Sequence, residues 1–177
     1  TSWTYDQRGR VTQESKVIDG AGTFVTEYNT YDAMDRVETM EYPDGEVVTH
    51  DYNDQGLLES MTGAAPYVEN VDYNEMGQKT VVEFGSNLET NYVYYTWADG
   101  LRRLQYLRTG TSSSPTSRQD LTYIYDPVGN VLSIEDKKNL DMQTHEYQSF
   151  TYDELDRLES ATATGGQGVY NRSYTYN

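Results

Sequence analysis

The sequence of 177 residues contains no cysteine, and this absence excludes a disulfide framework, a thiol nucleophile and a thiolate metal site. It also lacks an apolar run of the roughly 18 residues that a membrane-spanning helix needs, so we predict no membrane span. Histidine occurs only as His50 and His145, and neither has neighbours that would complete a catalytic or metal-binding set. We therefore expect no cofactor, no metal and no enzymatic activity.

Basic residues are scarce as well. The chain has 13 basic and 29 acidic residues, which gives a net charge of −16. Binding to a phosphate backbone requires clustered lysine and arginine, so we predict no nucleic-acid partner. The ordinary consequence of such a charge is solubility and repulsion between copies, and the alternative is a negative surface that attracts cations or a basic partner.

Hydrophobic residues make up only 36% of the chain and the mean hydropathy is −0.83, yet there are 18 tyrosines. This composition is too polar for a thick layered core and too aromatic for a disordered chain. A thin, ordered sheet that carries aromatic side chains satisfies both conditions.

The tyrosines mark an internal repeat. Tyrosine is followed by Asp or Asn, and Gly or Asp stands four residues after the tyrosine; with a degenerate and an eighth copy included, the tyrosines are 21 to 30 residues apart. The six copies are Tyr5, Asp6 and Gly9; Tyr31, Asp32 and Asp35; Tyr52, Asn53 and Gly56; Tyr73, Asn74 and Gly77; Tyr125, Asp126 and Gly129; and Tyr152, Asp153 and Asp156. We expect a degenerate copy that starts at Tyr95 and an eighth that begins at Tyr176 and Asn177.

The chemistry of this motif is that of a turn. Asp or Asn at the first position and Gly at the fourth are typical of a type I turn, and the Asp or Asn side chain can accept from backbone N–H groups two residues on. The Gly position is predicted to need a positive φ and to close the hairpin with a bulge. Asp35 and Asp156 fit there, because Asp tolerates the left-handed region better than most residues.

Alternating aromatic and β-branched residues on either side of each turn predict strands, as in "FTY" at 150–152. A second turn is expected between successive tyrosine motifs, most clearly at 43–45, with counterparts at 19–23, 63–66, 85–87, 137–139 and 165–166. In the fifth copy this slot widens to "RTGTSSSPTSRQD", and we predict a Ser/Thr-rich surface loop over 108–120. Each unit is thus two strands and two turns.

The predicted fold is all-β: tandem antiparallel hairpins, about fifteen strands in sequence, that form a long, curved and twisted sheet strip. We expect residues 1–177 to be a single array of about seven repeats and a fragment of a larger protein, since the sequence opens on Thr1.

The motif residues resemble the YD repeat, also called the RHS repeat. Its pattern of "YDxxGR" and then Val or Leu is present at Gly9-Arg10-Val11, Asp35-Arg36-Val37 and Asp156-Arg157-Leu158. The resemblance covers nearly the whole chain. The arginine is replaced in the other good copies, by Leu57, Gln78 and Asn130.

The family includes bacterial RHS proteins, shell-forming components of ABC-type toxin complexes and teneurins. The resemblance implies that the chain is part of a β-sheet shell that encloses a C-terminal domain, often a toxic one. It further implies a secreted or cell-surface protein, and the short regular units favour a prokaryotic source. The 126–129 stretch, "DPVG", is in register as a repeat turn, so we assign it no proteolytic role.

Two other interpretations stay open. Strand edges at the two ends of the array could join copies into an extracellular adhesion or filament-forming module, instead of pairing with the rest of the same chain. The tyrosine rings could stack on sugars, which makes a glycan an alternative partner. We favour a structural role for the tyrosines, because the repeat already explains their positions.

For His50 we favour a place on a sheet face.

Overall fold

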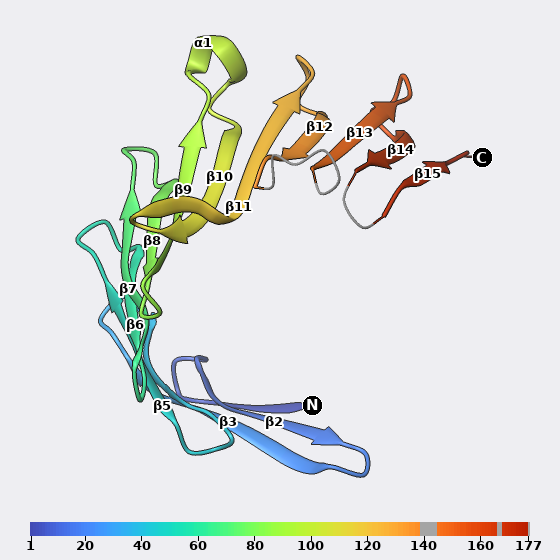
Figure 1. Cartoon of the computed structure of the whole chain (residues 1–177). Helices are drawn as coiled ribbons and strands as arrows, with labels where there is room; N and C mark the ends of the chain where they lie inside the picture. Colours follow the sequence, from blue (N-terminus) through green and yellow to red (C-terminus); the bar gives the residue numbers. More distant parts are fainter. Residues whose placement is uncertain (139–144, 166–167, 177) are drawn as a thin grey trace. The chain divides into compact units, whose positions relative to one another are not determined.

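The computed structural model describes residues 1–138, 145–165 and 168–176. Within these residues the chain forms fifteen β-strands and one short helix, and the strand order in the sheet is the chain order, β1 to β15 (Figure 1). Consecutive strands pair antiparallel wherever their register is defined. The predicted meander is confirmed. The second turns expected at 137–139 and 165–166, and the copy at Tyr176 and Asn177, fall partly on residues 139, 166 and 177, which lie outside the described residues.

The strands follow the tyrosine repeat. Each begins or ends at a turn motif, and their bounds are as follows. The strands up to the seventh are β1 Ser2–Tyr5, β2 Val11–Ile18, β3 Gly22–Tyr31, β4 Val37–Glu41, β5 Val47–Tyr52, β6 Leu58–Thr62 and β7 Pro66–Tyr73. The others are β8 Lys79–Phe84, β9 Leu88–Tyr94, β10 Leu104–Thr111, β11 Ser114–Tyr125, β12 Val131–Asp136, β13 Glu146–Tyr152, β14 Leu158–Thr164 and β15 Tyr170–Ser173; helix α1 is Trp97–Gly100.

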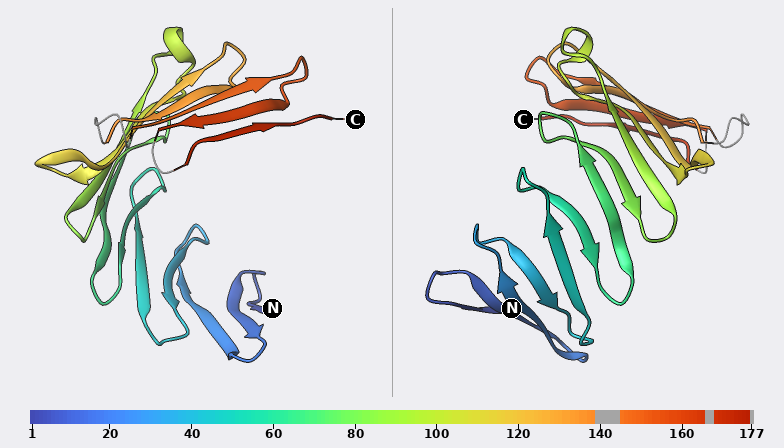
Figure 2. Two further views of the ribbon diagram at one scale, coloured as in Figure 1. Left: turned by 45° about the vertical axis from the view of Figure 1, so that its right-hand side comes forward. Right: turned by 90° about the vertical axis from the view of Figure 1, so that its left-hand side faces the viewer.

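The chain divides into two compact units. The first comprises residues 1–77 and 82–86, and the second comprises 78–81 and 87–177. Within each unit the hairpins form a single layer, and no other described element of that unit covers the sheet (Figure 2). Few side chains are therefore fully buried. They are Val48, Val71 and Val82 in the first unit, and Ala161, Ala163, Thr90 and Ser133 in the second.

The two sheet faces of the first unit differ in chemistry. Residues that oppose each other across the strands share a face, and Tyr28 opposes Met40, which opposes Val48. This face is apolar. The other face carries a row of paired threonines, in which Thr39 opposes both Thr30 and Thr49. The hydroxyls of Thr30 and Thr39 lie 2.7 Å apart, within hydrogen-bond distance, which stabilises the strand pair.

The Ser/Thr-rich loop expected over 108–120 is not a loop. These residues form the end of β10 and the start of β11, and only residues 112 and 113 lie between the two strands. Arg108 directly opposes Asp120 and its Nε lies 2.9 Å from the Asp120 carboxylate. The cross-strand charge pair and the threonines, which favour strands, explain why a polar stretch pairs here.

Candidate functional site

The turn motif has one geometry in copy after copy. At the second copy the Asp32 N–H donates to the Arg36 carbonyl at 2.9 Å, and the Asp35 N–H donates back to the Asp32 carbonyl at 3.1 Å. The Asp32 side chain accepts from the N–H groups of Met34 (2.8 Å) and Arg36 (2.9 Å). Asp6, Asn53, Asp126 and Asp153 make equivalent bonds. These residues cap their own turns, as the motif predicts.

The prediction of positive φ at the fourth position is confirmed in all six copies. The φ angle is 62° at Asp35 and 59° at Asp156, and it lies between 74° and 117° at Gly9, Gly56, Gly77 and Gly129. The predicted bulge is also present, because the strand register shifts at the motif tyrosine, for example between Thr4 and Tyr5.

Arginine after the turn neutralises the capping aspartate. Arg36 Nη2 lies 2.6 Å from Asp32 Oδ2, and Arg10 and Arg157 pair with Asp6 and Asp153 in the same way. The pKa of the Asp32 carboxyl is lowered from the ordinary value, chiefly by the hydrogen bond from the Arg36 backbone N–H. At Asp153 the side-chain hydrogen bond from Arg157 is the main cause of the lowered pKa.

Six repeat tyrosines link their copy to the one before it. At the copy of Tyr125 the bond runs the other way, because the Tyr95 hydroxyl donates forward to the Tyr123 carbonyl at 3.0 Å. The Tyr52 hydroxyl donates to the Val37 carbonyl at 2.8 Å, and Val37 is the first strand residue after the preceding turn. The same bond is made by Tyr31 to Val11, Tyr73 to Leu58, Tyr94 to Lys79, Tyr152 to Val131 and Tyr176 to Leu158. We call this series the tyrosine ladder. Burial raises the pKa of the Tyr52 hydroxyl, so this hydroxyl keeps its proton across the neutral range.

The arginines after the turns stack on the ladder. The guanidinium carbon of Arg36 lies 4.2 Å from the centre of the Tyr52 ring, and Arg10 and Arg157 lie over Tyr31 and Tyr176 in the same way. Each of these arginines therefore contacts an aspartate in its own turn and a tyrosine in the next copy. Such a cation–π contact contributes about 0.5–1 kcal/mol at an exposed site.

The degenerate copy starts at Tyr94, one residue before the predicted Tyr95. The ladder tyrosine there is Tyr94, not Tyr95, because Tyr94 donates to the Lys79 carbonyl and opposes Leu104 across the bulge. Tyr95 occupies the position of the capping aspartate, and its N–H donates to the Arg103 carbonyl at 2.9 Å. Two adjacent tyrosines left this register ambiguous in the sequence.

The turn between Tyr95 and Arg103 is enlarged by helix α1, which the sequence analysis did not predict (Figure 1). A helix of one turn has no apolar stripe to detect. The signal that marks it is the Thr96–Asp99 spacing: the Asp99 N–H donates to Thr96 Oγ1, and the Thr96 hydroxyl donates to Asp99 Oδ2 at 2.6 Å.

The two histidines do not join into a site. His50 faces Met61 across the strand pair β5–β6 on the apolar face of the first unit, consistent with the predicted place on a sheet face. His145 Nε2 lies 3.0 Å from a Glu135 carboxylate oxygen. Among the described residues, no group of three or more His, Asp or Glu side chains is arranged to hold a metal ion. Within the same residues, no helix is long and apolar enough to cross a membrane.

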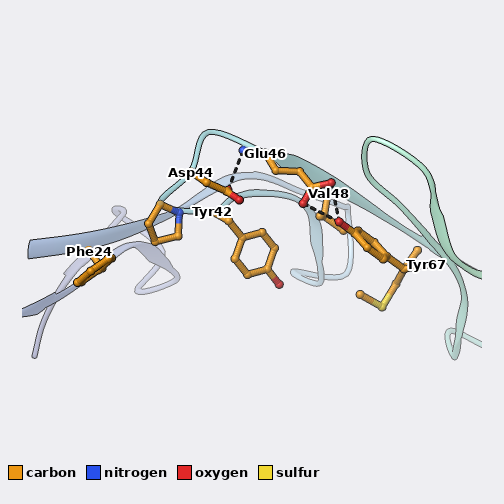
Figure 3. A pocket seen from close by; sticks show the side chains of 8 residues that line it. Phe24, Tyr42, Asp44, Glu46, Val48 and Tyr67 are labelled. Atoms are coloured by element: carbon orange, nitrogen blue, oxygen red, sulfur yellow. Dashed lines mark hydrogen bonds between the residues drawn. The ribbon is translucent and has the colours of Figure 1, made fainter. Parts of the chain in front are cut away.

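A hollow of about 600 Å³ on the first unit was not predicted. It is lined by Phe24, Tyr42, Pro43, Asp44, Glu46, Val48, Met61 and Tyr67. The hydroxyl of Tyr67 donates to the Glu46 carboxylate and lies 2.6 Å from both of its oxygens, and the Ala64 N–H donates to Glu46 Oε1 at 2.9 Å (Figure 3). The hydrogen bond to Glu46 raises the pKa of the Tyr67 hydroxyl. The sequence "PDG" at 43–45 predicts only a turn, and the residue that marks the hollow is the tyrosine before it, Tyr42.

The geometry defines a class of protein: an all-β array of hairpins in which ladder tyrosines bond successive repeats to each other. No family model matches the chain. Toxin subunit YenC2 of Yersinia entomophaga is 31% identical over 133 residues, which cover 59% of this chain and 14% of that protein.

Solved structures of toxin complexes are also similar to this chain, over most of its length. The crystal structure of TcdB2-TccC3 has a TM-score of 0.75 at 25% identity and covers 98% of this chain and 11% of that one. The Photorhabdus luminescens Tc holotoxin pore has a TM-score of 0.64 at 20% identity, over 93% of this chain and 11% of that one, and this likeness concerns the fold alone. The chain thus spans about a tenth of these structures' chains.

These likenesses agree with the resemblance seen in the sequence: the chain is similar in sequence and in fold to subunits of toxin complexes, which is consistent with a repeat protein of the RHS/YD shell type. They support a structural, toxin-related shell role.

Proposed function

We propose that this chain is a non-catalytic wall segment of an RHS-type β-sheet shell that encloses a C-terminal domain, often a toxic one. In this proposal residues 1–177 are one array of repeats within a longer protein. Its partners are the rest of its own chain, namely further repeats and the enclosed domain, and the protein is secreted or at the cell surface of a prokaryote.

The observation that carries the proposal is the tyrosine ladder. A wall must hold together sideways without a second layer, and single-layer sheets bury little apolar area. The ladder supplies one further hydrogen bond between successive repeats, as between Tyr52 and Val37. In the first, second and sixth copies a stacked arginine adds a cation–π contact. The likeness to TcdB2-TccC3 over 98% of this chain supports the same role.

A non-catalytic role is supported by how the motif carboxylates are used. Asp6, Asp32 and Asp153 each accept two backbone N–H bonds and one arginine side-chain bond. Carboxylates committed in this way are structural caps, and their lowered pKa values keep them ionised instead of placing them near neutrality for proton transfer.

The outermost strands favour a second candidate. Within the described residues β1 pairs only with β2, and β15 pairs only with β14. Their free edges are templates for another strand, which could come from a second copy in a filament or adhesion module.

Electron microscopy of the intact protein from which this chain comes separates the two. Closed, hollow particles of uniform size, with density inside, are expected for the shell. Filaments, or open particles with exposed ends, would overturn the shell and support assembly through strand edges.

A further inference from the structure

The hollow on the first unit holds aromatic rings that the tyrosine ladder does not use. Phe24, Tyr42 and Tyr67 are 39%, 38% and 46% exposed. The hydroxyls of Tyr42 and Tyr67 make no bond to a strand carbonyl among the described residues, unlike those of the ladder tyrosines. Exposed apolar surface gathered in one place marks an interaction site more often than scattered residues do.

The hollow also holds two carboxylates without a counter-ion. Asp44 and Glu46 line it, and neither forms an ion pair within the part of the chain that the structure describes. Glu46 is held in place by Tyr67 and by the Ala64 N–H, so its charge is fixed beside the rings (Figure 3).

The rest of the first unit does not neutralise these charges. That unit has four basic residues, Arg8, Arg10, Lys16 and Arg36, against seventeen acidic ones, a net charge of −13. All three arginines are already paired with turn aspartates, and Lys16, which opposes Phe24 across strands β2 and β3, forms no ion pair among the described residues. The hollow therefore complements a cation that arrives from outside the unit.

The shape of the hollow indicates an extended occupant. Phe24, Tyr42 and Tyr67 come from strand β3, the turn after β4, and strand β7, and they lie apart in that order across the view (Figure 3). Val48 and Met61 complete an apolar lining between them. A small compact ligand would contact one ring, whereas a stretch of polypeptide reaches all three.

We propose that this hollow binds a lysine or arginine side chain, flanked by apolar residues, from an extended polypeptide segment. The cationic group lies against the Asp44 and Glu46 carboxylates, its methylene stem packs on the Tyr42 ring, and the flanking apolar side chains contact Phe24 and Tyr67. The segment belongs to a separate protein, because this chain itself has a net charge of −16, and the site does not depend on enclosure.

The test uses two acetylated, amidated pentapeptides, Gly-Phe-Lys-Val-Gly and the same peptide with norleucine in place of lysine. Norleucine keeps the length and the apolar stem and removes the charge. Binding to the 177-residue chain is followed by isothermal titration and by the NMR signal of the Met61 methyl group. The lysine peptide should bind about five- to tenfold tighter than the norleucine peptide, and salt should weaken only the former.

Two matched variants test whether the Glu46 carboxylate is the charge that attracts the lysine. Glu46→Gln keeps a group that can bond Tyr67 and should remove most of the preference for lysine over norleucine. Asp51→Asn is the control. It removes one exposed carboxylate from strand β5, which follows Glu46, but on the threonine face, opposite Ser60, and should leave the preference intact. Thermal melts of both variants show that the chain remains folded.

Three results would overturn the proposal. The first is equal affinity of the lysine and norleucine peptides, and the second is an equal loss in Glu46→Gln and Asp51→Asn, which would reduce the effect to overall charge. The third is binding of tetramethylammonium as tight as that of the lysine peptide, which would mean a site for small ammonium ions.

Discussion

The turn between Asp32 and Arg36 and the enlarged turn between Tyr95 and Arg103 solve the same problem with different lengths of chain. Both are closed by an N–H to carbonyl bond of 2.9 Å between their first and last residues. Both end in an arginine that lies over a tyrosine of the next copy, Tyr52 in one and Tyr125 in the other. Between those ends, one holds a capped five-residue turn and the other holds helix α1.

The comparison separates what the array requires from what it tolerates. The closing pair, the tyrosine bonded to the preceding repeat and a residue that bridges to the next copy recur in both turns. The capping aspartate and the single residue at positive φ do not: the enlarged turn has Tyr95 in the aspartate position and two residues, Leu101 and Arg102, at φ of 55° and 62°. A turn can vary in length as long as its first and last residues keep their contacts.

Acid should have the largest effect, because it acts at once on the four ordinary turns that are capped by aspartate; the turns at Asn53 and Asn74 have no capping carboxylate. The pKa values of Asp6, Asp32, Asp126 and Asp153 lie below the ordinary value of 3.8 in the folded chain. Their stabilisation is therefore fully present above that value and is lost as the pH falls through the lowered folded values. Melting temperatures measured from pH 7 to pH 2.5 should fall steeply at the acid end. Asp32→Asn should make this fall shallower, and an unchanged profile would contradict the capping role.

Loss of a ladder tyrosine should come next. Tyr52→Ala removes the hydrogen bond to Val37 and the ring under Arg36, and should lower the free energy of unfolding by about 2–3 kcal/mol. Tyr94→Ala should have a similar effect, because Tyr94 holds the equivalent place before the enlarged turn. Urea denaturation measures both. Tyr42→Ala, an exposed tyrosine outside the ladder, is the control and should cost less than about 1 kcal/mol. A Tyr94→Ala effect as small as that control would restore Tyr95 as the repeat tyrosine.

A smaller gain is expected from relief of the left-handed backbone in the enlarged turn. Arg102→Gly should raise the free energy of unfolding by about 0.5 kcal/mol, because glycine adopts positive φ without a Cβ penalty, partly offset by its greater freedom when unfolded. The same change in the ordinary turn, Asp35→Gly, should give no gain, since it removes the carboxylate that pairs with Arg10 at 2.8 Å. Equal gains at both positions would show that the Asp35 contact contributes nothing.

The smallest effect should come from an engineered copy of the Asp35–Arg10 contact, placed between residue 56 and Arg36. A Cβ at Gly56 would lie 2.8 Å from Arg36 Nη1, a buried nitrogen without a hydrogen-bond partner among the described residues. Gly56→Asp therefore offers Arg36 the partner that Arg10 finds in Asp35. A double-mutant cycle with Arg36→Leu should give a favourable coupling of about 0.3–0.5 kcal/mol. A coupling of zero would mean that the guanidinium moves away from the new carboxylate.

Most of the fold could be predicted from the sequence, because local chemistry decides it. Asp or Asn five residues before the next strand, with Gly or Asp at the position of positive φ, sets the turn, and the period of two sets the strands. The tyrosine ladder could not be predicted in the same way. The bond from Tyr52 to Val37 joins a side chain to a backbone group 15 residues away, and only the register across the bulge brings them together.

The errors have physical causes too. Residues 108–120 were assigned to a loop because serine and glycine suggest flexibility, but pairing of Arg108 with Asp120 outweighs that local preference. The hollow was missed because its rings stand at unrelated positions of the repeat, and only the folded strands of the first unit place Phe24 and Tyr67 around Glu46.

The tyrosine ladder also gives the array a direction of growth. Every ladder bond runs from a later tyrosine back to an earlier carbonyl, as from Tyr31 to Val11 and from Tyr152 to Val131. As the polypeptide leaves the ribosome, each ladder acceptor is thus completed only when the next tyrosine has been synthesised. Among the described residues, the one junction that differs is that between Tyr95 and Tyr123, where the donor is made first. At the ladder positions, each newly made hairpin therefore stabilises the one made before it.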